Sequence, residues 1–209
     1  MPNWVDNTLD VIGKPEEVNE FINFMHTSNT VKHFHYERNE DGTSQGEVLK
    51  EYKHRSLFNF HALLPTPTDP KLYDDQRLED GSVIQPWYDW NLANWGTKWN
   101  AREVNFERTG EGEALYSFDT AWSPPMPIVE RLRKLFPTMT FFYRYQEEQG
   151  WGGEVTIRSG SVTHTEEWDI PETHQEYELR NGECVCSFEP DEEYWFSDCK
   201  ELQVTANEL

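Results

Sequence analysis

The side chains that could do chemistry gather in residues 86–101, which hold four of the nine tryptophans. Trp87 and Trp90 are three residues apart, so a helical turn would place them on one side. Trp95 and Trp99, four residues apart, would pair in the same way. Indole rings can stack on a nucleobase or another planar ligand while neighbouring polar groups orient it. The same rings can instead pack on a sheet as structural core, and we favour that role.

A ligand site built on this segment would add acidic, basic and amide side chains to the indole walls. Asp119, at the end of a predicted strand, could orient a ligand or pair with Lys98 as an internal tie. The candidate ligand-binding residues are Trp87, Asp89, Trp90, Trp95, Lys98, Trp99 and Asp119.

Catalytic signatures are missing from the sequence, which has no Gly-x-Ser-x-Gly, Walker loop, His-Glu-x-x-His or Rossmann glycine pattern. Cys184-x-Cys186, Cys199 and His174 are zinc-ligand types, but their spacing does not match the paired signature of zinc sites. We therefore predict no catalytic residue, no metal and no cofactor, and we favour a protein that is not an enzyme.

Net charge is the second signal. The chain has 39 acidic and 18 basic residues, a net charge of −21. From Glu166 to the end, the sequence has 14 acidic residues and two basic ones, Arg180 and Lys200. More than half of the net charge therefore lies in the last fifth of the chain. Such a field repels phosphate backbones and anionic lipid and attracts basic protein surfaces. We therefore expect no direct nucleic-acid or membrane binding, although acidity that serves only solubility is the competing explanation.

The acidic surplus predicts contacts with a basic protein partner. The carboxylates expected to bind such a partner are Glu166, Glu167, Asp169, Asp191, Glu192 and Glu193.

Hydrophobic periodicity predicts alternating strands and helices. Residues 4–12 alternate as a strand, and 15–27 show helical spacing after Pro15. Residues 37–52 are polar and contain two glycines, which predicts a loop, whereas 57–64 resemble a strand. The remaining predictions are a short helix near 87–95, strands at 101–107 and 114–119, a helix ending near Phe136, a strand at 140–145, a hairpin of 153–158 with 161–168, and further strands at 176–179 and 184–188.

This order of elements predicts an α+β fold of the split βαβ type. Two helices would cover one face of a four-stranded antiparallel sheet, in a ferredoxin-like sandwich. The Trp-rich segment would be a helical insertion between the halves, and the C-terminal residues would add extra β-strands. In the strand at 140–145, Phe141, Tyr143 and Tyr145 share one face, where they are expected to form aromatic core.

Three segments resemble a known family. They are Met-Pro-Asn-Trp-Val-Asp-Asn-Thr-Leu-Asp-Val-Ile-Gly at the start, Trp-Tyr-Asp-Trp-Asn-Leu-Ala-Asn-Trp-Gly-Thr-Lys-Trp-Asn-Ala at 87–101, and Phe-Asp-Thr-Ala-Trp-Ser-Pro-Pro at 118–125. They look like the Api92-like family of phage and plasmid proteins with a YubB-type ferredoxin-like domain. The resemblance covers roughly residues 1–158 and implies a ferredoxin-like fold and a mobile-element origin. It implies no catalytic residues.

Together these observations predict two units, a ferredoxin-like domain at 1–158 with its insertion at about 86–101, and an acidic C-terminal β extension at 159–209. The leading hypothesis is a phage- or plasmid-encoded protein that binds and inhibits a basic host protein, such as a nucleic-acid-binding defence factor, by mimicking nucleic-acid charge. A small-ligand or nucleotide binder using the Trp-rich segment is the alternative. Without a signal-peptide pattern or a long apolar run, the host cytoplasm is the expected location.

Overall fold

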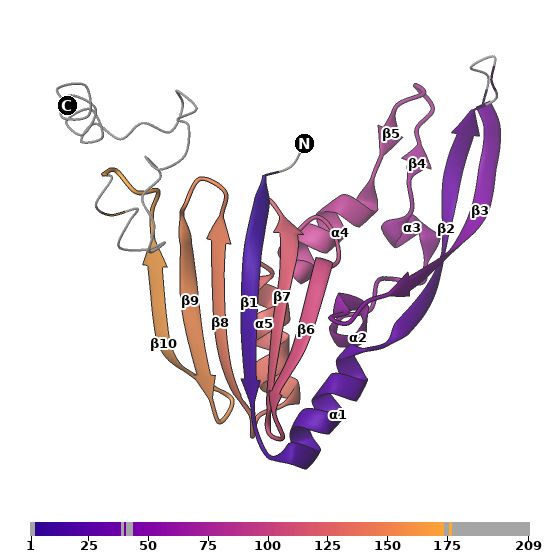
Figure 1. Ribbon diagram of the computed structural model, residues 1–209. Helices are drawn as coiled ribbons and strands as arrows, with labels where there is room; N and C mark the ends of the chain where they lie inside the picture. The colour runs from indigo at the N-terminus through magenta and orange to yellow at the C-terminus, as the bar shows by residue number, and fades with distance from the viewer. Residues whose placement is uncertain (1–2, 39, 41–43, 174–175, 177–209) are drawn as a thin grey trace, which may run out of the picture.

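The computed structural model describes residues 3–38, 40, 44–173 and 176. Its main sheet has six antiparallel strands in the order β10-β9-β8-β1-β7-β6 (Figure 1). The strands are β1 Trp4–Ile12, β6 Arg102–Gly110, β7 Glu113–Ala121, β8 Thr140–Glu147, β9 Gly152–Arg158 and β10 Ser161–Trp168.

Four of these strands and two helices form the split βαβ arrangement. Helix α1 (Pro15–Met25) follows β1, and helix α5 (Met126–Leu135) connects β7 to β8. The order β8-β1-β7-β6 places the first strand of each half at the centre of the sheet, as in a ferredoxin-like fold. The predicted α+β fold class is therefore confirmed, with six strands in the main sheet where four were expected.

Alternation along the strands gives the sheet two different faces. Val5, Leu9 and Val11 of β1 are buried on the face covered by the helices, and the helices place Phe21 and Leu132 in the same core. Burying a large apolar side chain contributes about 1.5–3 kcal/mol, so this face holds most of the stabilising contacts. We call it the helix face, and we call the other side, which carries the intervening residues, the open face. Phe141, Tyr143 and Tyr145 lie on the helix face, as the pattern predicted.

One polar residue is built into this core. The Asn7 side chain is only 2% exposed on β1. Its amide donates to the Val5 and Phe118 carbonyls at 2.7 and 3.0 Å, and Tyr143 donates its hydroxyl to the Asn7 Oδ1 at 2.6 Å. Buried polar groups are tolerated when they are hydrogen-bonded, and these bonds tie β1 to both of its neighbours.

A long insertion lies between α1 and β6. It begins with a two-stranded ribbon of β2 (Ser28–Arg38) and β3 (Ser44–Arg55), which extends away from the main sheet (Figure 1). The predicted loop at 37–52 is therefore wrong, because most of it is ladder-paired strand outside the main sheet. The rest of the insertion comprises α2 Phe60–Leu63, α3 Pro70–Tyr73, β4 Gln76–Arg77, β5 Val83–Ile84 and α4 Pro86–Trp95.

The strand predicted at 57–64 is also wrong. Phe60–Leu63 forms a short helix whose first turn is capped by Asn59, since the Asn59 side chain accepts a hydrogen bond from the His61 backbone N–H at 3.1 Å. Phe58 and Phe60 are buried in the core beside Phe118, so a compact turn buries the apolar residues that looked like a strand.

The β9–β10 hairpin extends the sheet beyond the four central strands, in agreement with the hairpin predicted there. It crosses the expected boundary between 158 and 159, and the division into two units stays a prediction. The strands predicted at 176–179 and 184–188 lie outside the described residues, apart from Glu176. Among the helices of the described part, none is long and apolar enough to cross a membrane.

Candidate functional site

The predicted Trp-rich site divides into buried and surface residues. Trp95 is 2% exposed, and its indole N–H donates to the Leu64 carbonyl at 2.9 Å. Trp90 packs edge-on against Trp95 at 5.6 Å, and Trp87 donates its indole N–H to Asp75 at 2.9 Å. Trp90 and Trp95 thus hold α4 against the core, which is the structural role that we favoured, and Trp87 ties the helix to the segment that carries Asp75. Asp89 is exposed in the first turn of α4.

Lys98 and Trp99 lie beyond the helix, in a cluster of surface aromatics. The Lys98 Nζ lies 4.6 Å from the ring centroid of Trp99, 4.4 Å from that of Trp122 and 5.8 Å from that of Tyr88. Two hydrogen bonds join the loops that carry these rings, because Thr97 donates its hydroxyl to Ala121 at 2.9 Å and Ser123 donates to Gly96 at 2.5 Å. The Trp-Gly-Thr-Lys-Trp segment and the Phe-Asp-Thr-Ala-Trp segment therefore meet at Lys98.

Asp119 lies on the open face and has different neighbours. The sheet register pairs it with Asp6 on β1 and Arg102 on β6. Burial raises its pKa, the adjacent Asp6 carboxyl raises it further, and Arg102 lowers it. Within the described ranges, Lys98 and Asp119 form no ion pair, so the internal tie considered for them is not made.

The predicted partner-binding carboxylates do not share one face. Glu166 pairs with Glu154 on the open face, whereas Glu167 pairs with Gly153 and therefore projects toward the helix face. Asp169 follows directly after β10 and is exposed. Asp191, Glu192 and Glu193 lie outside the described residues.

An open pocket surrounds the end of β10, with a volume of about 430 Å³. This size is within the range of small-ligand pockets. It is lined by Tyr145, Trp151, Gly152, Glu167, Trp168 and Asp169. The pocket thus unites two of the predicted carboxylates with three aromatic residues that the sequence analysis had not linked to them.

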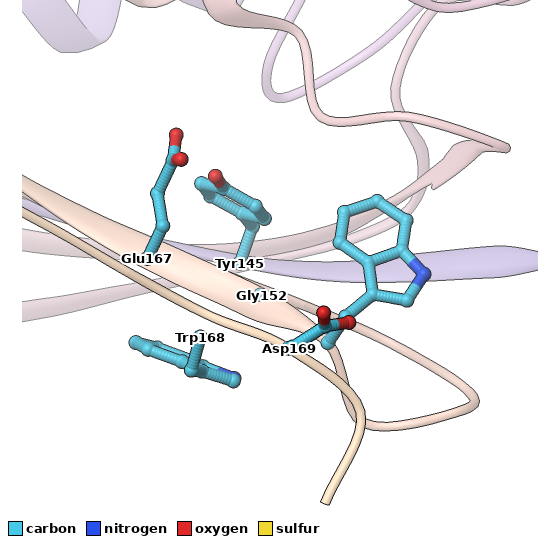
Figure 2. A pocket seen from close by; sticks show the side chains of 6 residues that line it. Tyr145, Gly152, Glu167, Trp168 and Asp169 are labelled. Carbon is cyan, nitrogen blue, oxygen red and sulfur yellow. The ribbon is translucent and has the colours of Figure 1, made fainter.

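The side chains of the pocket project from both sides of the hairpin. Figure 2 shows Glu167 and Tyr145 rising together on one side of the strands, with the Trp168 ring on the other side. Burial raises the pKa of Tyr145, and the nearby Glu167 carboxylate raises it further. The Trp168 ring lies under the Arg144 guanidinium at 5.2 Å. In the part of the chain described here, its indole N–H is the buried side-chain donor left without a partner.

Two adjacent glycines let these aromatic side chains approach the backbone. A Cβ on Gly152 would lie 2.3 Å from the Tyr145 carbonyl and 2.9 Å from the Trp168 ring. A Cβ on Gly153 would lie 2.6 Å from the Tyr145 hydroxyl. Glycine within a strand marks such close approaches. The Gly152-Gly153 pair is the sequence signal that could have located the pocket.

The chemistry of this pocket suits a cation. Aromatic faces attract ammonium and guanidinium groups, and carboxylates form charge-assisted hydrogen bonds with them. Within the described ranges, Glu167 has no ion-pair partner, so its charge is directed to solvent.

Comparisons with known proteins agree with the fold. Residues 94–189 match the family model described as "Ferredoxin-like domain in Api92-like protein", so the match extends past residue 158. The crystal structure of protein Api92 from Yersinia pseudotuberculosis is similar, with a TM-score of 0.58 and 10% sequence identity, covering 82% of this chain and 99% of that chain. At this identity the likeness concerns the fold alone. No curated protein matches the chain.

The family match begins inside the Trp-rich segment and includes β6, β7, α5 and β8 to β10. Residues 94–189 are thus similar to the ferredoxin-like domain of Api92-like proteins, and the chain shares the fold of Api92.

Proposed function

We propose that this chain is an interaction protein that binds a basic protein, with the pocket at the end of β10 receiving an arginine or lysine side chain. The observation that carries the proposal is the placement of Glu167 and Asp169 beside Tyr145, Trp151 and Trp168 in one pocket. Aromatic anchors combined with charge complementarity are typical of protein interfaces.

The charge of the whole chain supports the same partner. A net charge of −21 accelerates encounter with a basic surface and repels nucleic acid and acidic proteins. The pocket would then add a specific anchor, since the bound cation is held by aromatic rings as well as by carboxylates. At about 0.1 M salt, attraction between exposed charges more than about 10 Å apart is largely screened. The contacts of a partly buried charged side chain are screened less.

The proposed biological setting is inhibition of a host protein. The resemblance of the sequence to phage and plasmid proteins supports an origin on a mobile element. A basic groove that holds nucleic acid in a host defence factor would attract this acidic chain, which would occupy the groove in competition with nucleic acid. The host cytoplasm is the place where such an encounter would occur.

A titration with short peptides tests the pocket directly. Blocked peptides containing arginine or lysine should change the intrinsic tryptophan fluorescence, because Trp151 and Trp168 line the pocket. The same peptides with glutamate in place of the basic residue are the control and should give no change. Equal responses to both peptides, or no response to the basic ones at low salt, would contradict the proposal.

A second function, binding of a small anionic ligand, is favoured by one observation at Lys98. Its ammonium lies among Tyr88, Trp99 and Trp122, and within the described residues it has no carboxylate partner. A nucleotide could stack on Trp122, which is 41% exposed, and place its phosphate on Lys98. Adding nucleotides should then quench fluorescence in the wild type and not in Lys98→Met. Quenching that persists in Lys98→Met would reject this second function.

A further inference from the structure

A different group of side chains lies on the open face of the β9–β10 hairpin. The Nε2 of His164 is 3.2 Å from a Glu154 oxygen and 3.7 Å from a Glu166 oxygen. The three ligand atoms all lie within 4.8 Å of one another. One imidazole and two carboxylates therefore converge on a single point at the surface.

The backbone register creates this convergence. Glu154 on β9 is directly opposite Glu166 on β10, and His164 is two residues before Glu166, so all three project from the same face. A register shift between Val162 and His164 sets the position of the histidine. Like charges directly opposite each other destabilise an antiparallel pair. A cation between Glu154 and Glu166 would offset that repulsion.

The neighbouring Arg144 guanidinium does not neutralise these two carboxylates. Arg144 on β8 is paired with Glu154 in the register, but its guanidinium stacks on the Trp168 ring at 5.2 Å. Across the described residues, Arg144 and Glu154 form no ion pair. In the described part of the chain, His164 is the residue that contacts both carboxylates.

The spacing fits a metal ion with little rearrangement. Ligand atoms about 2.0–2.2 Å from a tetrahedral zinc lie about 3.3 Å from one another. The two distances from His164, 3.2 and 3.7 Å, are close to that value. All three side chains are at least 40% exposed, so small rotations can close the remaining gap and water can complete the coordination.

We propose that Glu154, His164 and Glu166 bind one divalent transition-metal ion of the zinc type. Imidazole nitrogen favours zinc, nickel or copper over magnesium and calcium, which prefer oxygen ligands alone. The ion joins β9 to β10 and stabilises the edge of the sheet, because binding to the folded state adds to its stability. This site shares no side chain with the pocket, whose Glu167 projects from the other side of the same strand.

Zinc titration by calorimetry, after removal of metal with a chelator, tests the site. The full chain is used with Cys184, Cys186 and Cys199 changed to serine, so that thiolates do not compete for zinc. We expect one ion per chain. We also expect His164→Gln and Glu166→Gln each to weaken binding at least about tenfold, the scale seen even for residues that only support a metal ligand.

The matched control is Glu113→Gln, which removes one carboxylate from the same face of the sheet, far from Glu154, His164 and Glu166. The zinc affinity of this variant should equal that of the parent. Zinc should also raise the midpoint of thermal unfolding in the parent and not in His164→Gln. Absence of zinc binding, or equal weakening in the control and in His164→Gln, would overturn the proposal.

Discussion

Lys98 and Asp119 show how single residues find neighbours that are distant in the sequence. Lys98 is enclosed by rings from α4 and from the loop after β7, among them Trp122. Trp122 adopts a φ of +70°, which is costly for a bulky residue. Asp119 is pressed against another carboxyl, that of Asp6, on the open face. The first arrangement includes a strained backbone at Trp122, and the second includes repulsion between two carboxyl groups. The contribution of each arrangement to the free energy of unfolding can be measured with a single substitution.

Replacing Lys98 with methionine should destabilise the fold. Methionine keeps the length of the side chain but removes the charge that the three aromatic rings attract. We expect the free energy of unfolding to fall by about 0.5–2 kcal/mol in urea denaturation. Lys71→Met, at an exposed position of α3, is the control and should change it by less than about 0.5 kcal/mol. Equal losses in the two variants would show that the aromatic enclosure contributes nothing.

Replacing Asp6 with asparagine should stabilise the fold at neutral pH. Burial and the Asp6 carboxyl raise the pKa of Asp119, so the folded chain holds this proton more tightly than the unfolded chain does. The ionised pair therefore costs stability above the folded pKa, and the cost fades as the pH falls toward the ordinary aspartate value. We expect Asp6→Asn to add about 0.2–1 kcal/mol at pH 7 and less near pH 4. A gain that grows on acidification would contradict this account.

At the scale of elements, the sequence predicted those parts whose periodicity reports burial. Strands β1 and β8 and helices α1 and α5 each bury one face against the common core, so their apolar spacing is regular. The β2–β3 ribbon forms a separate sheet, and its polar sequence carries no such periodicity.

The pocket was only half predictable. Charge pointed to Glu167 and Asp169, but the register that brings Tyr145 beside Glu167 comes from pairing across three strands. Because residues 161–168 were predicted as a strand, alternation alone places Glu166 and Glu167 on opposite faces. The ladder adds their partners, with Glu154 opposite Glu166 and Gly153 opposite Glu167.

The glycine pair of β9 gives a prediction at this scale. In Gly153→Ala the new methyl would meet the Tyr145 hydroxyl at 2.6 Å and the Glu166 carbonyl at 2.8 Å, so a strand or the ring must move. We expect a loss of about 1–3 kcal/mol in the free energy of unfolding, measured by chemical denaturation. Gly13→Ala should cost less, because its nearest neighbour is the flexible Met139 side chain at 3.4 Å. Similar costs at both sites would argue against close packing at the pocket.

At the scale of the whole molecule, the two sides of the β9–β10 hairpin carry different groups of side chains. The open face brings Glu154, His164 and Glu166 together, and the other side places Glu167 beside Tyr145 in the pocket. A net charge of −21 acts on any approaching partner at long range and does not distinguish these sides. The pocket includes Glu167 and not Glu166. Specific binding of a basic partner should therefore depend on Glu167 much more than on Glu166.

The most direct test compares Glu167→Gln with Glu166→Gln in chelator-treated protein, with affinity for an arginine-containing peptide measured by calorimetry. Both substitutions remove one charge from β10, but only Glu167 lines the pocket. The account predicts that Glu167→Gln weakens binding by at least about tenfold, equivalent to roughly 1.4 kcal/mol, while Glu166→Gln weakens it by less than about twofold. Equal weakening in the two variants would contradict the account, because it would mean that overall charge, and not the pocket, holds the basic partner.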